Sequence, residues 1–385
     1  MFRFLPSKVF TTISNKIVKK KTFNVLGIET SCDDTAVAIV NSDRQIISEA
    51  IHLQQHLHEP NGGIVPNLAM ASHQQNLPLV VREALDKSNL DLIRDIDVIA
   101  VTRGPGLPAC LGIGLSAAKT LAAALWKPLI GVHHMEAHAL TARLTSPGSE
   151  LLQFPFLTLL ISGGHTLILV THNVNQYTQL GTTLDDSIGE AFDKTSRLLG
   201  IPWVKGRRGG PGAALEQLAL EGDPKKYSVT IPMRGERQRY SMDMSFSGLK
   251  TAINNLITKY DLDLNDSIIK KDLAITFQQT AIKHLTDKME LAFQWCKKNN
   301  ISLTSLVVSG GVASNKNIRE SLQLLATQKH NVQLICPPPH LCTDNGVMVA
   351  WAGVERFREG LVDEYTIDHM PRWPITSLGS STKYL

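Results

Sequence analysis

Two histidines four residues apart are the side chains of this sequence best suited to hold a metal ion. His134 and His138 lie in His-Met-Glu-Ala-His within a helical pattern, and this spacing places both imidazoles on one helix face. The glutamate falls on another face, so the pattern is not the HExxH motif of thermolysin-like metalloproteases. A third ligand is needed, and spacing leaves four candidates open: His133, His73, Glu136 or a distant carboxylate such as Asp344. Two imidazoles and an aspartate suit zinc or ferrous iron.

Glycine-rich turns follow several apolar strands and are candidates for phosphate binding. Ser162-Gly163-Gly164-His165 separates two predicted strands like a hairpin tip, and Ser309-Gly310-Gly311 precedes a predicted helix over 312–327. Glycine lets backbone N–H groups approach an anion, and a helix N-terminus adds attraction. Asn315 could add a side-chain amide. Tight turns also use glycine for geometry alone. No GxxxxGK[ST] string is present, which excludes a P-loop NTPase.

Two pairs of carboxylates stand at positions where they could act on a ligand. Asp33 and Asp34 follow the first predicted strand and could order a metal, a water or a nucleotide. The alternative for them is an Asx-type turn that satisfies its own backbone. Glu190 and Asp193 lie three apart on one helical face, where the alternative is a solvated surface shared with lysine and arginine.

The net charge of +4 hides an uneven distribution. Residues 1–22 contain six of the 39 basic residues and no acid, which leaves 33 bases against 35 acids in the body of the chain. A basic leader of this kind, with Ser, Thr and Phe but no long apolar stretch, is typical of a mitochondrial transit peptide. The alternative is a disordered basic tail that binds nucleic acid.

A second basic segment, over 201–240, carries a local excess of four positive charges on an otherwise acidic body. Such a patch suits a polyanion such as RNA, held through its phosphates, whereas the alternative is a soluble surface loop. The bases we consider for RNA contact are Lys205, Arg207, Arg208, Arg234, Arg237 and Arg239.

Composition and length place the chain among globular proteins of two lobes. With 385 residues, 43% hydrophobic and 19% charged, the chain can bury a sizeable core. It has no uncharged apolar run of 18 residues, so we expect no membrane span. Five cysteines without a CxxC pair favour neither a disulfide framework nor a zinc ribbon, and indicate a reducing compartment.

The order of predicted elements indicates an α/β fold with two halves of similar design. Apolar runs and helical patterns predict strands over 25–29, 35–40, 45–51, 96–101, 128–132, 156–161, 166–171, 305–308 and 332–335, and helices over 67–88, 111–125, 133–144, 187–199, 247–259, 273–298, 312–327 and 345–358. Pro78 is a possible break in the first helix. We expect duplicated mixed sheets with flanking helices and a cleft between the halves. The expected domains are the leader 1–22, an N-terminal lobe 23–150 and a C-terminal lobe 151–385, whose final helix near 343–359 packs back on the N-terminal lobe.

Nine ordered motifs between about residues 24 and 358 closely resemble the universal tRNA threonylcarbamoyladenosine transferase family. They are LGIETSCDDTAVAIV, GGIVPNLAMASHQQNLPLV, TRGPGLPACLGIG, HHMEAHA, LLISGGHT, DDSIGEAFDKTSRLLG, SFSGLKTA, VSGGVASN and CTDNGVMVA. With its leader, the chain is similar to the mitochondrial branch of that family. The resemblance implies the two-lobed architecture of actin, sugar kinases and heat-shock ATPases.

The resemblance also implies roles for individual residues. It implies that His134, His138 and Asp344 hold one divalent metal, zinc or iron, and that Asp33 and Asp34 lie near the reacting group, although the family usually has glutamate at the position of Asp34. It implies an adenylate site made by Leu160, Ile161, Ser162, Gly163, Gly164, Glu190, Asp193, Gly210 and Asn315. The turn before Gly210 is longer here than in the family, so Gly206 is the other candidate for that position.

The reaction implied by the resemblance is the transfer of a threonylcarbamoyl group to tRNA. The donor is threonylcarbamoyl-adenylate, made by a separate synthase, so an adenine nucleotide is part of substrate and product. The acceptor is N6 of adenosine 37 in the anticodon arm of mitochondrial tRNAs that read ANN codons. We further expect a homodimer in the mitochondrial matrix. Competing hypotheses are an actin-like ATPase or small-molecule kinase, a glycoprotein-directed metalloprotease and a non-catalytic nucleotide-binding scaffold.

Overall fold

The computed structural model describes residues 22–146, 152–202 and 210–379. The predicted leader therefore lies outside the described residues except for Thr22, and so do Lys205, Arg207 and Arg208. The chain divides into two compact units. Of the described residues, the first contains 22–146, 173–176 and 344–379, and the second contains 152–172, 177–202 and 210–343.

The first unit is built on a five-stranded mixed sheet with the strand order β3-β2-β1-β4-β5. Its strands are β1 (Asn24–Glu29), β2 (Thr35–Asn41), β3 (Ile46–His52), β4 (Val98–Gly104) and β5 (Leu129–His133). β1 pairs antiparallel with β2 and parallel with β4, and β4 pairs parallel with β5. The carboxyl ends of β1, β4 and β5 therefore meet at one edge of the sheet.

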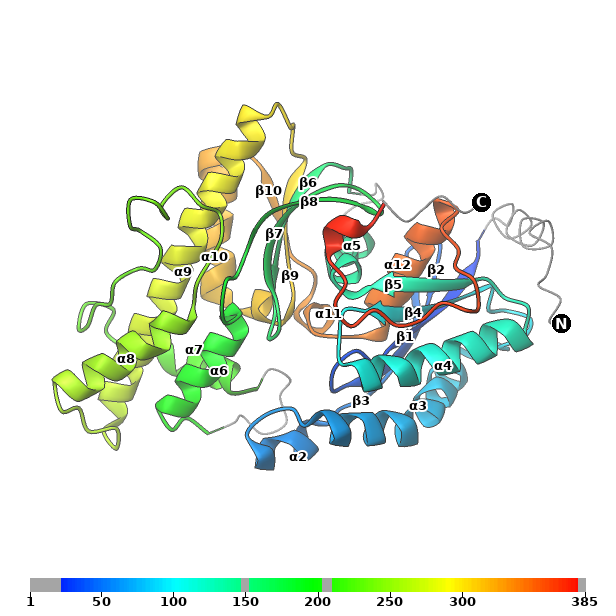
Figure 1. The fold of residues 1–385 in the computed structure, drawn as a ribbon, viewed down its shortest axis with the longest axis horizontal. Helices are drawn as coiled ribbons and strands as arrows, with labels where there is room; N and C mark the ends of the chain where they lie inside the picture. Colours follow the sequence, from blue (N-terminus) through cyan, green and yellow to red (C-terminus); the bar gives the residue numbers. More distant parts are fainter. Residues whose placement is uncertain (1–21, 147–151, 203–209, 380–385) are drawn as a thin grey trace. The chain divides into compact units, whose positions relative to one another are not determined.

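Helices cover both faces of this sheet (Figure 1). The larger helices are α3 (Pro66–Ser88), α4 (Pro108–Ala124), α5 (His134–Thr145) and α12 (Gly346–Arg358), with shorter turns at α2 (Gln55–His58), η1 (Glu59–Asn61) and η4 (Ile375–Ser377). Leu26 and Ile28 of β1 point to the core shared with α3 and α4. Val25 and Gly27 alternate with them and face α12.

Three glycines allow α12 to lie very close to the first sheet. A Cβ added at Gly27 of β1 would stand 2.3 Å from the backbone nitrogen of Ala350 in α12. One added at Gly346 would stand 2.5 Å from the backbone nitrogen of Ala38, and one at Gly353 would stand 2.6 Å from the side chain of Ala100. No larger residue fits at these positions without separating helix and sheet.

The second unit repeats the same topology in another five-stranded sheet, with the order β10-β9-β6-β7-β8. Its strands are β6 (Phe156–Ile161), β7 (Thr166–Asn173), β8 (Gln176–Thr182), β9 (Ser305–Ser309) and β10 (Gln333–Ile335). β6 pairs antiparallel with β7 and parallel with β9, as β1 does with β2 and β4. β9 pairs parallel with β10, as β4 does with β5.

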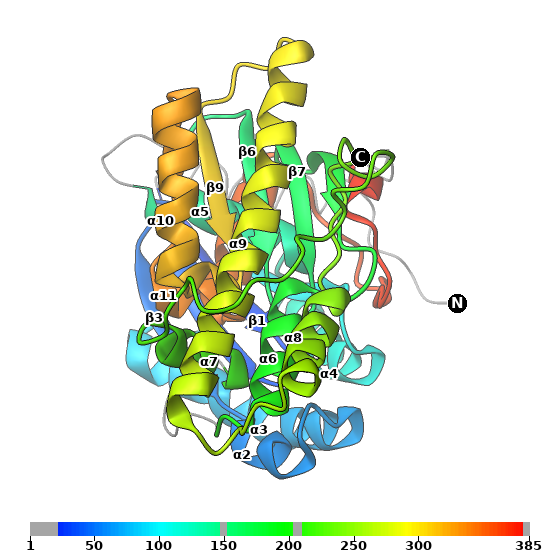
Figure 2. The ribbon, with the colours of Figure 1, turned by 90° about the vertical axis from the view of Figure 1, so that its left-hand side faces the viewer.

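The helices of the second unit pack on this sheet around one large hydrophobic core. They are α6 (Ile188–Leu198), α7 (Gly210–Ala219), α8 (Ser247–Lys259), α9 (Ser267–Lys298), η2 (Gly311–Ser314), α10 (Lys316–Leu324), η3 (Leu325–Lys329) and α11 (Pro339–Cys342). Figure 2 shows α9 and α10 lying in front of β6, β7 and β9.

Several elements differ from the expectations raised by the sequence. Pro78 lies inside α3 without ending the helix. β8 and α7 were not predicted, because β8 lacks a long apolar run and α7 begins in a Gly-Pro-Gly sequence. The helix expected over 312–327 begins only at Lys316, because a short 3-10 turn precedes it and Asn315 caps it. Among the described residues, no helix is long and apolar enough to cross a membrane.

We predict that Gly27→Ala lowers the free energy of unfolding by about 1–3 kcal/mol, because the new methyl group meets the backbone of α12. Gly112→Ala in α4 is the matched control. A Cβ there meets nothing within 4 Å, so its helix propensity should leave stability unchanged or raise it by less than about 1 kcal/mol. Urea unfolding of both variants tests this, and equal midpoints would contradict close packing at Gly27.

Candidate functional site

Three potential metal ligands converge in the first unit. β5 ends at His133 and α5 begins at His134, while Asp344 stands just before α12. Asp344 Oδ1 lies 3.4 Å from His134 Nε2 and 3.1 Å from His138 Nε2. One ligand atom of each residue lies within 4.8 Å of the other two. The helical spacing thus aims both rings at one carboxylate that is 206 residues distant in sequence from His138.

The other candidates for a third ligand are engaged elsewhere. His133 caps α5, where its Nδ1 accepts from the backbone N–H of Met135. His73 Nδ1 lies 2.7 Å from Thr35 Oγ1. Glu136 is fully buried and forms an ion pair with Arg356 at 2.8 Å. Among the described residues, only His134, His138 and Asp344 form a group that could hold a metal ion.

Glu29 contacts the ring nitrogen of His134 that does not face Asp344, and this contact was not predicted from the sequence. This carboxylate ends β1 and is 1% exposed. Its Oε2 lies 3.2 Å from His134 Nδ1 and accepts from the hydroxyl of Thr102 in β4, while Oε1 accepts from the backbone N–H of Ser31. A carboxylate beside Nδ1 orients the ring and favours a proton on that nitrogen, which leaves Nε2 directed at Asp344. An acid that ends a buried strand was the only signal in the sequence.

The charges of this cluster depend on one another. Burial by itself would lower the pKa of His134, but the carboxylates of Asp344 and Glu29 raise it to about 10. Burial would likewise raise the pKa of Asp344, but His134 and His138 hold that pKa well below its ordinary value. The site therefore stabilises a positive charge between two carboxylates.

The donor set fits the zinc or iron that the sequence resemblance implies. Two imidazole nitrogens and one carboxylate are the ligands found in open zinc sites and in the facial triads of ferrous iron. The donors come from the first turns of α5 and from the bend just before α12, and Glu29 adds the outer carboxylate that commonly orients a ligating histidine.

Asp33 and Asp34 lie in the turn after β1, in the same unit. Burial raises the pKa of Asp33, and the carboxylate of Asp344 raises it further. Asp34 Oδ1 accepts from the backbone N–H of Gln54, so it also ties this turn to the segment after β3. Burial raises the pKa of the neighbouring Cys32 thiol well above its ordinary value, and Asp33 adds to this, so Cys32 is not an activated nucleophile.

In the second unit, the turn Ser162–His165 is a hairpin tip with exposed glycines. The backbone N–H of Ser162 donates to the carbonyl of His165, and Gly163 and Gly164 are exposed. Ser187, which caps α6, donates its hydroxyl to the carbonyl of Gly163 at 2.5 Å. The N-terminus of α6 therefore packs directly against the turn. Leu160 and Ile161 are buried in β6, so their side chains belong to the core.

The second glycine-rich turn lies beside the first, because β6 and β9 are parallel neighbours. Gly310 has φ +100°, and a Cβ there would stand 2.4 Å from the carbonyl oxygen of Ile161. Asn315 caps α10 through Oδ1 and donates its side-chain N–H to Gln278 Oε1 at 3.0 Å. Asn315 is thus held in one orientation by two partners.

Asp193 and Gly210 also lie together, on α6 and at the start of α7. Asp193 Oδ1 accepts from the backbone N–H of Gly212 at 2.7 Å, and an added Cβ at Gly210 would stand 3.7 Å from the same oxygen. Burial raises the pKa of Asp193 to about 6, although the hydrogen bond from Gly212 opposes it. Glu190 points to Lys194, with 2.9 Å between Oε1 and Nζ.

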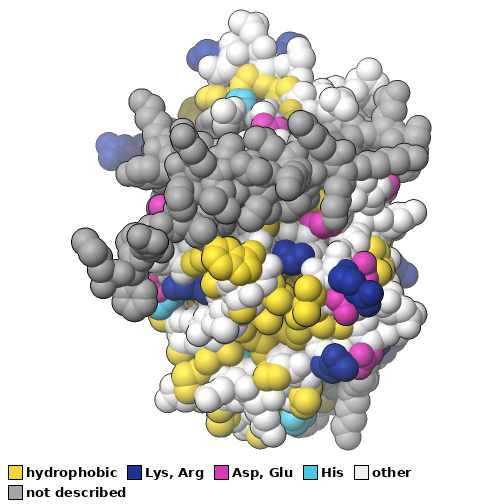
Figure 3. All heavy atoms as spheres, turned by 90° about the vertical axis from the view of Figure 1, so that its right-hand side faces the viewer, with side chains coloured by type: hydrophobic (Ala, Val, Ile, Leu, Met, Phe, Trp, Pro, Cys, Tyr) yellow, Lys and Arg dark blue, Asp and Glu magenta, His cyan; other side chains and the backbone are white. Residues whose placement is uncertain are grey.

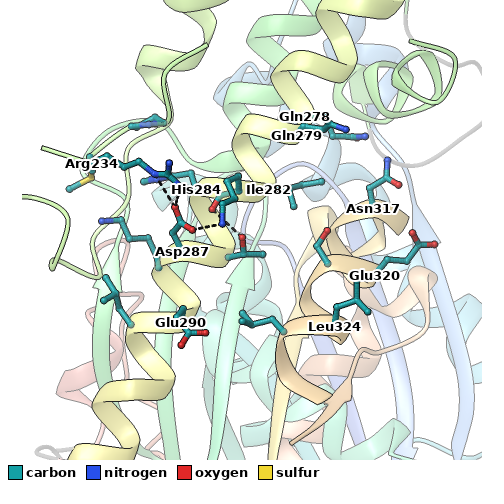
Figure 4. Close-up of a pocket in the computed structure, with 18 of the residues that line it drawn as sticks. Arg234, Gln278, Gln279, Ile282, His284, Asp287, Glu290, Asn317, Glu320 and Leu324 are labelled. Atoms are coloured by element: carbon teal, nitrogen blue, oxygen red, sulfur yellow. Dashed lines mark hydrogen bonds and ion pairs between the residues drawn. The ribbon is translucent and has the colours of Figure 1, made fainter. Parts of the chain in front are cut away.

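The described members of the basic segment are exposed but differ in their partners. Arg234 forms an ion pair with Asp287 of α9. The guanidinium carbon of Arg239 lies 4.7 Å from the centre of the Tyr240 ring. Arg234 and Arg239 line a pocket of about 1120 Å³ between the 232–239 segment, α9 and α10, where Arg234 reaches Asp287 (Figure 4). No residue predicted to bind the adenylate lines this pocket.

Comparison with known proteins connects this geometry to one family. The family model described as tRNA N6-adenosine threonylcarbamoyltransferase matches residues 45–351. An Arabidopsis thaliana protein named probable tRNA N6-adenosine threonylcarbamoyltransferase, mitochondrial, is 46% identical over 369 residues, which cover 91% of this chain and 74% of the relative. A Zymomonas mobilis tRNA N6-adenosine threonylcarbamoyltransferase is 45% identical, with 91% of each chain covered.

Two solved structures share the fold at low sequence identity. HypF of T. kodakarensis is 14% identical with a TM-score of 0.56, covering 88% of this chain and 47% of HypF. Component A of Acidaminococcus fermentans (R)-2-hydroxyglutaryl-CoA dehydratase is 13% identical with a TM-score of 0.50, covering 87% of this chain and 99% of that protein. The predicted α/β class with duplicated mixed sheets is confirmed.

We predict that Glu29→Gln lowers the free energy of unfolding by about 1–3 kcal/mol. The new amide group turns a donor toward either Ser31 N–H or the Thr102 hydroxyl, and one buried donor loses its acceptor. Glu83→Gln, on the exposed face of α3, is the control and should change stability by less than about 0.5 kcal/mol. Chemical unfolding that finds the two variants equal would contradict the supporting role of Glu29.

We also predict that Asp193→Asn stabilises the fold above pH 6. The wild-type carboxyl has a pKa near 6 in the fold against an ordinary value of 3.8, so its folded state loses stability as pH rises through 6. Asparagine keeps the acceptor for Gly212 without the buried charge. Each pKa unit corresponds to about 1.4 kcal/mol, and partial exposure reduces this, so we expect a gain of about 1–2 kcal/mol at pH 7.5.

This gain should shrink toward zero near pH 4, where wild-type Asp193 carries a proton. Thermal unfolding across this pH range measures it, with Asp86→Asn on the exposed surface of α3 as control. A difference that does not depend on pH would show that the Asp193 carboxyl is not destabilised by burial.

Proposed function

The chain belongs to the tRNA N6-adenosine threonylcarbamoyltransferase family, and from this premise we propose its specific reaction. It transfers the threonylcarbamoyl group from threonylcarbamoyl-adenylate to N6 of adenosine 37 in mitochondrial tRNAs that read ANN codons. The products are N6-threonylcarbamoyladenosine in the tRNA and AMP.

The observation that carries this proposal is the convergence of His134, His138 and Asp344 in a chain with this family relationship. We propose that these three side chains hold one divalent ion, zinc or iron. When bound, the ion supplies a Lewis acid that orients the donor and neutralises charge developing on oxygen. Glu29 keeps the Nε2 atom of His134 available for this purpose.

The second unit is proposed to bind the adenylate part of the donor. The exposed backbone at Gly163 and Gly164 can offer N–H groups to a phosphate, and the turn at Gly310 follows the neighbouring strand β9. The proposed adenylate set is Leu160, Ile161, Ser162, Gly163, Gly164, Glu190, Asp193, Gly210 and Asn315. Leu160 and Ile161 contribute through the end of β6 rather than through their buried side chains.

In the proposed reaction, the N6 amine attacks the carbamoyl carbon of the donor. A bond forms between N6 and this carbon, and the bond from the carbon to the phosphate oxygen breaks as AMP leaves. N6 must lose a proton, and Asp33 and Asp34 are the proposed acceptors near the reacting group. The raised pKa of Asp33 brings this carboxylate closer to the pH at which a general base is effective. An adenine amine is a weak nucleophile, so positioning supplies much of the rate.

The basic segment is proposed to contact the anticodon arm of the tRNA. The exposed guanidinium groups of Arg237 and Arg239 are available for phosphates, whereas that of Arg234 is partly neutralised by Asp287. A single-stranded loop exposes its bases to an enzyme without the cost of opening a duplex. The full proposed set is Lys205, Arg207, Arg208, Arg234, Arg237 and Arg239.

The setting of the reaction is also a proposal. The mitochondrial name of the Arabidopsis relative and the basic leader support a location in the matrix. There a separate synthase supplies the donor.

Hydrophobic side chains gather on one face among scattered charges (Figure 3), and Leu79, Ile93 and Trp126 of the first unit are largely exposed. Such a surface supports a homodimer.

The decisive experiment is nucleoside mass analysis of mitochondrial tRNA from cells that lack the protein. We expect N6-threonylcarbamoyladenosine to disappear, to return with the wild-type chain, and to stay at least tenfold reduced with His138→Ala. His56→Ala, an exposed histidine of the same unit, is the control and should restore the modification fully.

An unchanged level of the modification after loss of the protein would overturn the proposal. Phosphoryl transfer from ATP to a small hydroxyl compound by the purified chain, with no modification of tRNA, would instead favour the small-molecule kinase.

A further inference from the structure

Glu136 lies between His134 and His138 on α5, but its side chain is buried in the core and pairs with α12. Its Oε2 accepts from Arg356 Nη1 at 2.8 Å, and its Oε1 accepts from the backbone N–H of Asn175 at 2.8 Å. The glutamate of the His-Met-Glu-Ala-His motif is therefore neither a ligand nor a base in this arrangement.

The partner of Glu136 belongs to the helix that carries the third proposed ligand. Arg356 is near the end of α12, and Asp344 stands just before the start of the same helix. α12 is held on the first sheet by close contacts at Gly27, Gly346 and Gly353. Because α12 is fixed in this way, the ion pair between Glu136 of α5 and Arg356 of α12 also fixes α5 relative to Asp344.

A second buried ion pair joins the same two helices farther along α5. Arg143 Nη2 lies 3.0 Å from Glu355 Oε2, and both side chains are buried. Glu136 lies two residues from each histidine, whereas Arg143 lies five residues beyond His138. The two pairs therefore permit a comparison of two buried arginine–glutamate pairs that lie at different positions along α5.

Stability alone is a weak reason for such pairs. Removing two charges from water costs free energy that their attraction only partly returns, and well-packed hydrophobic residues are often as stable or more stable. A buried ion pair does, however, restrict how two elements can be placed, because any shift leaves charges unsatisfied. The pair nearest the histidines is thus suited to set their position.

We propose that Glu136 and Arg356 are positioning residues whose ion pair sets the distance of His134 and His138 from Asp344. The inference rests on the metal site of the proposed function. It assigns to the motif glutamate the task of holding α5 on α12, so that the two Nε2 atoms and the carboxylate face one point.

Titration of the purified, metal-free full-length chain with Co²⁺ tests this proposal, because the visible spectrum of bound Co²⁺ reports its ligands and geometry. Glu136→Gln should weaken Co²⁺ binding about tenfold and change the spectrum, as loss of an outer partner commonly does. Arg356→Lys should also weaken Co²⁺ binding and change the spectrum. This variant provides the test if Glu136→Gln does not fold. Thermal unfolding of each variant records stability separately.

Glu355→Gln is the matched control, because it neutralises a buried glutamate of the other pair between the same helices. We expect it to lower stability but to leave Co²⁺ affinity within threefold of wild type and the spectrum unchanged. Wild-type affinity and spectrum in both Glu136→Gln and Arg356→Lys would overturn the proposal, as would an equal loss of affinity in Glu355→Gln. If His138→Ala binds Co²⁺ as wild type does, the proposed metal site itself fails, and this inference fails with it.

Discussion

The close contact of α12 with the first sheet is the constraint on which the candidate site of this unit depends. α12 begins at Gly346, two residues after Asp344, and glycines on both the strand and the helix let their backbones approach. α5 begins where β5 ends, so the histidines are placed by the same sheet. The separation of the three donors is therefore set by packed regular elements, which hold side chains more precisely than loops do.

The sequence was informative where the signal is local. Alternating and helical patterns located most strands and helices, and the spacing of His134 and His138 placed both imidazoles on one face. The hairpin at Ser162 was predicted correctly for the same reason. A capping side chain is a weaker local signal, and the late start of α10 at Lys316 was missed although Asn315 stood in the sequence.

Long-range contacts were beyond such reasoning. Spacing could not choose Asp344 over His133, His73 or Glu136, because the choice depends on where α12 returns to the sheet. Glu29 was overlooked because nothing local distinguishes it from any polar residue that ends a strand. Its role appears only when β1 and β4 are paired and Thr102 comes to lie beside it.

The two units place different chemistry on equivalent edges of sheets with the same topology. In the first, an acid ends β1 and histidines stand where β5 ends and α5 begins. Glu29 and Asp344 flank His134, so that positive charge is favoured between them. In the second, glycines follow β6 and β9, and of these Gly163 and Gly164 are exposed whereas Gly310 is buried. A shared topology provides the edge where strands end, but the side chains there decide its partner. Acids and imidazoles suit a cation, whereas glycines leave room for an anion to approach the backbone.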